Sequence, residues 1–226
     1  MQTSSFLHGK IIYLLIAVVS NHFLYPLSEI NQTASTIYVF FYCILIGIGG
    51  YVTSIDQKRL VLSTIFTVGA TISGILWAIT SNDRTINIYL WMFYIILIID
   101  LLIICYTLLE FIFLSEMINR NVLMAGVTLY MLIGNLFTPI YLFLNAIYFN
   151  FTEMNAFGLH TRTIDLTWQR MYYFSLTTLT TLGYGDISPV ASFVEPFVTA
   201  ESIIGVLYVA ILMARLVSLY DQHKAR

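Results

Sequence analysis

The residues of this chain best suited to binding an ion lie in one short stretch, Thr180–Asp186, which reads Thr-Thr-Leu-Gly-Tyr-Gly-Asp. In it, Gly183 and Gly185 alternate with larger residues. Left-handed backbone conformations are open mainly to glycine, so this spacing lets left- and right-handed residues alternate. Successive carbonyl groups then point toward one axis, where their oxygens replace the hydration shell of a cation. A glycine-rich turn followed by an aspartate is the alternative interpretation.

The five residues Thr181–Gly185, here named the TLGYG segment, resemble the TVGYG filter motif of potassium channels. The resemblance implies stacked rings of backbone oxygens that bind K⁺, and the bound K⁺ is the permeant ion. The Thr181 hydroxyl is expected to add the innermost ring. The carbonyl groups concerned are those of Thr181, Leu182, Gly183 and Tyr184. It also implies that Asp186 lies at the outer mouth. The alternative for Asp186 is a turn or N-cap residue before Pro189.

Residues 165–178, which precede the TLGYG segment, are expected to form a short helix with Asp165 as its N-cap. In the family that the chain resembles, this helix enters the membrane from outside, and the dipole at its C-terminus favours a cation beneath the filter. Here Tyr173 and Phe174 stand where many members have a Trp pair, and Thr177 stands where some have a supporting Glu. The residues expected to support the filter are Thr177, Thr178, Thr180 and Glu201.

The composition places these residues in a membrane. The chain has 226 residues, of which 59% are hydrophobic and only 10% charged, and its mean hydropathy is +0.84. A soluble domain typically carries about 25% charged residues. Several apolar runs are each close to the length that crosses about 30 Å of hydrocarbon as a helix. They cover residues 11–27, 36–54, 60–80, 86–114, 122–148 and 197–219.

The basic residues predict the orientation of these six spans. One side of the membrane receives Lys10, Lys58, Arg59, Arg120, Lys224 and Arg226, with Arg215 nearby, and the other receives Arg84, Arg162 and Arg170. The positive-inside rule then places both termini in the cytoplasm and the TLGYG segment toward the outside. We expect the chain to cross the inner or plasma membrane of a cell several times.

The expected fold is an all-α integral membrane protein with six transmembrane helices, a re-entrant pore helix and a filter loop. Residues 1–118 are predicted to form a four-span domain like a voltage sensor, and residues 119–226 the pore domain. One chain supplies one TLGYG segment and contains no internal repeat, whereas a closed ring of carbonyl groups needs four. The predicted assembly is therefore a homotetramer with fourfold symmetry.

The fourth span, residues 86–114, contains no basic residue and carries Asp100 and Glu110 instead. Because voltage sensing requires several charges to move through the membrane field, conventional voltage gating is not expected. Asp100 is a candidate pH or ion sensor, or else a structural carboxyl group bonded to a partner such as Asn135 or Thr128.

Three residues of the last span have two interpretations each. Gly205 is a candidate gating hinge by resemblance, or a small residue that allows close helix packing. Glu201 either braces the back of the filter, through Thr177 or tyrosine side chains, or reaches a wet interface. Arg215 is expected to extend to lipid headgroups or to pair with Asp221.

The function that the resemblance implies is passive, selective K⁺ conduction, as in small bacterial six-span channels, with K⁺ and the lipid bilayer as partners and no nucleic acid. A non-conducting or modulatory membrane subunit is the main alternative. The membrane subunit of an active K⁺ transporter is a weaker one, because such chains resemble four joined pore repeats. The sequence contains no nucleophile–base pair, metal-ligand cluster or phosphate loop, so an enzyme is not expected.

Overall fold

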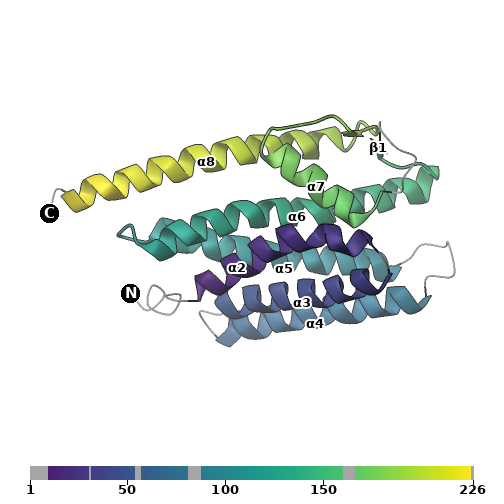
Figure 1. Cartoon of the computed structure of the whole chain (residues 1–226), viewed down its shortest axis with the longest axis horizontal. Coiled ribbons are helices and arrows are strands. Elements are labelled where there is room, and N and C mark those ends of the chain that lie inside the picture. Colours follow the sequence, from purple (N-terminus) through teal and green to yellow (C-terminus); the bar gives the residue numbers. More distant parts are fainter. Residues whose placement is uncertain (1–9, 31, 54–56, 81–87, 160–165, 225–226) are drawn as a thin grey trace. The chain divides into compact units, whose positions relative to one another are not determined.

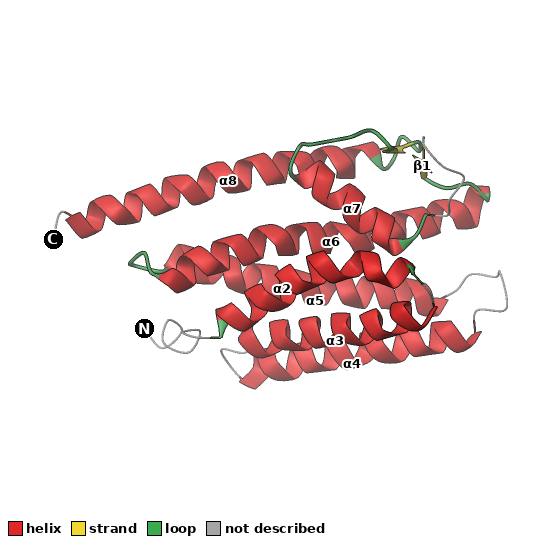
Figure 2. Cartoon of the chain, in the orientation of Figure 1, coloured by secondary structure: helices red, strands yellow, loops and turns green. Residues whose placement is uncertain are grey.

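The computed structural model describes residues 10–30, 32–53, 57–80, 88–159 and 166–224. Nearly all of them are helical, as Figures 1 and 2 show. In chain order the elements are α2 (Ile11–Leu24), the 3₁₀ helix η1 (Tyr25–Glu29), α3 (Gln32–Thr53), α4 (Gln57–Thr80), α5 (Ile88–Leu114), α6 (Arg120–Thr152), β1 (Phe157–Leu159), α7 (Trp168–Leu179), β2 (Ile187–Pro189) and α8 (Glu195–Lys224).

Each predicted apolar run corresponds to one of these helices, with ends that differ by a few residues. Within the described residues, four helices are long and apolar enough to cross a membrane: Ile11–Ser28, Ile88–Leu114, Arg120–Thr152 and Glu195–Ser218. Helices α3 and α4 contain 22 and 24 residues, and their crossing of the membrane stays a prediction.

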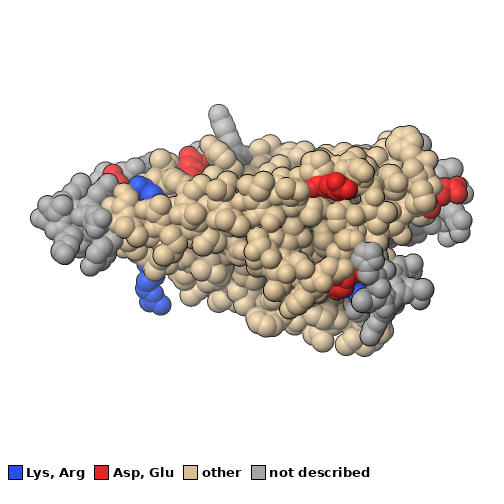
Figure 3. Space-filling model, turned by 90° about the horizontal axis from the view of Figure 1, so that it is seen from above, with Lys and Arg blue, Asp and Glu red and all other residues tan. Residues whose placement is uncertain are grey.

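Much of the helix surface is apolar. Large hydrophobic side chains are exposed along α2, α5 and α8. On the face that Figure 3 shows, most of the surface carries neither acidic nor basic groups. Soluble monomers rarely expose apolar patches of this extent, so these faces require an apolar surrounding such as lipid or another chain.

The chain packs as two compact units. Unit 1 comprises Met1–Thr67, Asp100–Leu132 and Tyr208–Arg226, and unit 2 comprises Val68–Ile99 and Ile133–Leu207. Helices α4, α5, α6 and α8 each contribute residues to both units. This division by packing differs from the predicted boundary between residues 118 and 119, which stays a prediction about function.

Small residues allow close helix contacts within unit 1. A Cβ atom added to Gly49 would lie 2.6 Å from Cδ1 of Ile104, and one added to Gly50 would lie 2.0 Å from the hydroxyl oxygen of Ser63. These two glycines therefore let α3 approach α5 and α4, as small residues do between helices in membranes.

Asp100 lies buried on α5, and its partner differs from the expected ones. Its Oδ2 accepts a hydrogen bond of 3.3 Å from the Thr67 hydroxyl of α4. Thr128 instead donates to the carbonyl of Met124 in its own helix. The choice depends on which face of α5 meets α4, and the weakly amphipathic sequence of α5 does not indicate that face. A sensor role for Asp100 stays a prediction.

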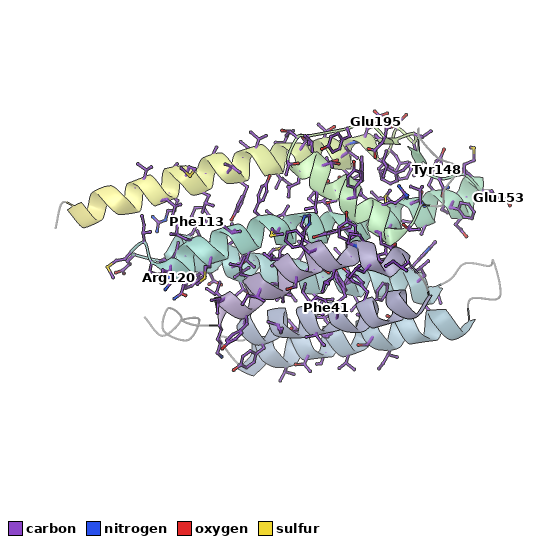
Figure 4. The ribbon with its side chains drawn as sticks, viewed as in Figure 1. Phe41, Phe113, Arg120, Tyr148, Glu153 and Glu195 are labelled. Atoms are coloured by element: carbon purple, nitrogen blue, oxygen red, sulfur yellow. The ribbon has the colours of Figure 1, made fainter. Side chains whose placement is uncertain are left out.

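Arg215 also binds differently from expectation. Its Nη2 donates to the carbonyl oxygens of Phe113 and Ser115, each at 2.8 Å. Phe113 lies in the last turn of α5, close to the start of α6 at Arg120 (Figure 4). The last carbonyl groups of a helix lack intrahelical partners and carry partial negative charge, so a guanidinium group satisfies them well. Arg215 therefore caps α5 instead of extending to lipid headgroups.

We expect Arg215→Gln to destabilise the protein by about 2 kcal/mol, because hydrogen bonds from charged groups contribute about 1.5–3 kcal/mol. Thermal unfolding in detergent measures this effect. Arg120→Gln is the matched control, because the Arg120 side chain is exposed. Equal melting temperatures for the two variants would contradict the capping role.

Candidate functional site

The TLGYG segment begins just after α7, the helix expected to be a pore helix. Helix α7 covers Trp168–Leu179, with Thr167 at its N-cap position and no side-chain capping bond. The helix therefore begins three residues later than predicted, and Asp165 lies outside the described residues. Within unit 2, α7 lies between the second half of α6 and the start of α8 (Figure 1).

The backbone of the TLGYG segment alternates in handedness. Thr181, Gly183 and Gly185 have φ angles of +59°, +49° and +77°. A left-handed threonine costs about 1–2 kcal/mol. Strained residues of this kind persist only where the surrounding structure holds them, and they cluster at functional sites.

The bonds that hold this backbone come from the end of α7. The carbonyl of Thr177 accepts from the N–H groups of Leu182 at 2.8 Å and Gly183 at 3.2 Å, and the carbonyl of Thr178 accepts from Thr181 N–H at 2.9 Å. Among the described residues, no backbone N–H donates to the carbonyl groups of Thr181–Tyr184. The first N–H groups of the segment thus turn toward the helix, while its carbonyl oxygens have no internal partner.

The large side chains of the segment are exposed in the single chain. Leu182 is 54% exposed and Tyr184 is 67% exposed. The Tyr184 ring stacks on Tyr173 of α7, with centroids 6.3 Å apart and an interplanar angle of 6°. All five residues of the TLGYG segment are thus exposed in the single chain, and Asp186, which follows directly, is half-buried.

The threonines expected to support the segment contact α7 itself. The Thr177 hydroxyl donates to the carbonyl of Phe174 at 2.9 Å, and the Thr180 hydroxyl donates to the carbonyl of Leu176 at 2.7 Å. Thr178 is buried. Thr177 thus contacts the TLGYG segment through its carbonyl oxygen and not through its side chain.

Glu201 of α8 is fully buried, and its carboxylate joins three helices. Its Oε2 accepts a hydrogen bond from the Tyr141 hydroxyl of α6, and its Oε1 accepts one of 2.5 Å from the Ser175 hydroxyl of α7. Ser175 also lies 2.8 Å from the carbonyl oxygen of Gly134. The buried carboxylate thus pairs with a tyrosine, as one interpretation expected, but its other partner is Ser175 instead of Thr177.

The Tyr141 ring extends this junction to the strand β1. Its centroid lies 5.3 Å from that of Phe174 on α7 and 5.4 Å from that of Phe157 on β1, and Phe157 and Phe174 are also 5.4 Å apart. Edge and tilted contacts of this kind stabilise a structure by about 0.5–1.5 kcal/mol per pair beyond the burial of their area. Tyr141, Ser175, Phe157, Phe174 and Glu201 thus connect α6, α7, α8 and β1, and are here named the Glu201 junction.

Gly205 lies where α8 crosses the end of α7. A Cβ atom added there would lie 2.0 Å from the carbonyl oxygen of Leu179 and 3.0 Å from its carbonyl carbon. Only glycine permits this approach of helix to backbone, which agrees with the close-packing interpretation. Helix α8 runs without interruption through Gly205. A bending role for this residue stays a prediction.

Sequence reasoning missed Ser175, Tyr141 and Phe157 as members of this site. A polar residue inside a helix that dips into a membrane is a signal that could have indicated Ser175. No comparable signal marks Phe157, because it belongs to a strand of only three residues. An aromatic residue in a chain with 16 Phe and 16 Tyr does not stand out either.

Comparison with known proteins supports a channel. Residues 140–222 match the model of a family described as an ion channel. This region contains the end of α6, all of α7, the TLGYG segment and nearly all of α8. Searches of curated proteins and of solved structures gave no significant match. Together with the apolar helices, the match indicates a multi-pass membrane protein that carries an ion channel domain.

We expect Tyr141→Phe to destabilise the protein by about 1–3 kcal/mol, because it leaves one oxygen of the buried Glu201 carboxylate without its donor while keeping the ring. Tyr148→Phe is the control: Tyr148 lies farther along α6 and is half-buried, with its ring against Phe193. Thermal unfolding in detergent compares the two. A similar small loss in both would show that the hydroxyl–carboxylate bond is unimportant.

We expect Gly205→Ala to lower thermal stability by about 1–3 kcal/mol, because overpacking of this size forces the backbone to shift. Gly69→Ala is the matched control, since a Cβ atom there meets Ile96 at an ordinary 3.6 Å. A Gly205→Ala protein with unchanged stability but altered open probability would favour the hinge interpretation over close packing.

Proposed function

We propose that this protein is a K⁺-selective channel in which four copies of the chain conduct ions passively through a ring of TLGYG segments. One observation supports it above the others. The backbone is left-handed at Thr181, Gly183 and Gly185. The first three N–H groups of the segment donate to carbonyl groups of α7, whereas, among the described residues, the carbonyl oxygens of Thr181–Tyr184 accept no backbone hydrogen bond.

The chemistry of K⁺ agrees with this arrangement. A hard cation that leaves water needs several oxygen ligands, and backbone carbonyl groups supply them at no cost in side-chain ordering. In a membrane, an irregular backbone with unbonded carbonyl groups is tolerated only where it lines a water-filled path or is buried in protein. An ion path meets both requirements. The ligands are the carbonyl groups of Thr181, Leu182, Gly183 and Tyr184, with Asp186 at the outer mouth.

The exposed side chains support assembly into a tetramer. Leu182 and Tyr184 lie on the surface of the single chain beside the unbonded carbonyl groups. A fourfold ring covers these side chains with neighbouring copies while the carbonyl groups face the axis. The apolar face of α8, which includes Ile203, Val206 and Leu207, gains a partner in the same step.

We do not expect this channel to be opened by the conventional voltage-sensor mechanism. Helix α5 occupies the place of the fourth span, and its sequence contains no Lys or Arg. Too few charges are therefore available in it to couple opening steeply to the membrane potential.

The test is ion flux through liposomes that contain the purified chain, with K⁺, Rb⁺ and Na⁺ compared. We expect Gly183→Ala to abolish K⁺ flux or reduce the preference for K⁺ over Na⁺ at least about tenfold, because a left-handed alanine costs about 1–2 kcal/mol in each of four chains. In the part of the single chain that the structure describes, no atom lies within 4 Å of a Cβ added at Gly183, so the expected effect comes from the backbone conformation and not from a clash within the chain.

Gly47→Ala provides the control, because a Cβ added there also meets no atom within 4 Å but the backbone is helical. It should insert and conduct as the wild type does. Absence of K⁺ flux through the wild-type chain would favour a non-conducting subunit. Unchanged selectivity in Gly183→Ala would exclude the carbonyl ring.

A further inference from the structure

The chain that follows the TLGYG segment is fastened to the chain that precedes α7. Strand β2 (Ile187–Pro189) pairs in antiparallel fashion with β1 (Phe157–Leu159), so that Leu159 faces Ile187 and Phe157 faces Pro189. Strand β2 begins one residue after Asp186. The outer end of the TLGYG segment therefore leads directly into this small sheet.

Ala156 connects the sheet to a long helix. Its carbonyl oxygen accepts from the N–H groups of Val190 at 2.8 Å and Ala191 at 3.1 Å. Its own N–H donates to Oδ1 of Asn145 on α6 at 2.8 Å. Every backbone hydrogen-bonding group of this fully buried residue is thus in use. Each of these bonds lies within unit 2.

The end of α6 is shaped to bring Ala156 back to Asn145. Glu153 follows the last helical residue with a left-handed φ of +56°, and its N–H donates to the carbonyl of Phe149 at 2.8 Å. Such a residue reverses the chain direction after a helix. Figure 4 shows Tyr148 and Glu153 near this end of α6. The returning chain then passes Asn155, whose Oδ1 accepts from Nδ2 of Asn145 at 3.3 Å.

From these contacts we infer that Asn145 is a positioning residue for the outer end of the TLGYG segment. This inference rests on the proposed function. Gly185 is left-handed and exposed, and because glycine has no side chain, no side-chain contact of this residue restrains the peptide that joins it to Asp186. The restraint comes from residues 187–191, which the sheet and the Ala156 carbonyl hold in place, and Asn145 fixes Ala156 to α6.

The test compares three variants with the wild type in liposomes. Asn145→Leu keeps the size of the side chain but removes the acceptor for Ala156 N–H. Asn145→Asp keeps an acceptor for Ala156 N–H, while it replaces the Nδ2 donor with a second oxygen and adds a negative charge. Asn155→Ala removes the partner of Nδ2 and leaves the bond to Ala156 intact. The readouts are the decay of Rb⁺ uptake at low external K⁺, the K⁺/Na⁺ preference, and hydrogen exchange at residues 187–191.

We expect Rb⁺ uptake through Asn145→Leu to start and then decay about fivefold faster than in the wild type, the size of change that one lost hydrogen bond produces. Hydrogen exchange at Val190 and Ala191 should accelerate in the same variant. Asn145→Asp and Asn155→Ala should match the wild type in each readout.

Two outcomes would overturn the inference: decay and exchange in Asn145→Leu equal to the wild type, or an equal effect in Asn155→Ala. If Asn145→Leu does not insert, the exchange of Val190 and Ala191 in the wild type decides, and rapid exchange there contradicts the anchor. A wild-type chain that shows no preference for K⁺ over Na⁺ would instead refute the proposed function. The two failures can be distinguished, because hydrogen exchange at residues 187–191 does not depend on which ion passes.

Discussion

The structure of unit 2 depends on one buried carboxylate. An ionisable group inside a membrane span is costly unless its oxygens find donors, and Glu201 finds one on α6 and one on α7. Because the two donors come from different helices, satisfying the carboxylate fixes α6, α7 and α8 against one another. The ring of Tyr141 then extends the same constraint to β1 through Phe157 and Phe174. Helix α7 is thereby held in place directly before the TLGYG segment.

The TLGYG segment is held from its two ends by different means. At the inner end, carbonyl groups of α7 take up the N–H groups of Thr181, Leu182 and Gly183. At the outer end, the sheet β1–β2 and Ala156 hold the chain that follows Asp186. Neither restraint uses a carbonyl oxygen of Thr181–Tyr184. A backbone fixed through its donors leaves its acceptors available, and that is the condition for a carbonyl site with a constant radius.

The sequence predicted the helices well because long apolar runs carry a strong signal, as the agreement between residues 86–114 and α5 shows. It also predicted a left-handed conformation at Gly183 and Gly185, since only glycine adopts it without strain. It did not predict the partners of Asp100 and Arg215, or Ser175 as a partner of Glu201. Those depend on which helix faces meet, and α5 and α8 are apolar around most of their circumference, so no face stands out. Strands of three residues give too little periodicity to be recognised.

The contact between Gly205 and Leu179 limits how α8 can move. The carbonyl of Leu179 lies very close to Gly205. If α8 rotated here, either a residue larger than glycine would be pressed against α7, or α8 would have to move away from α7. Leu179 is followed directly by Thr180 and the TLGYG segment. A bend of α8 at Gly205 would therefore displace the end of α7 and disturb the site that the Glu201 junction fixes. A bend nearer the C-terminus of α8, beyond Leu207 and outside unit 2, would leave that site intact. For the proposed channel, a bend of α8 beyond Leu207 is therefore the movement that would leave the TLGYG segment undisturbed.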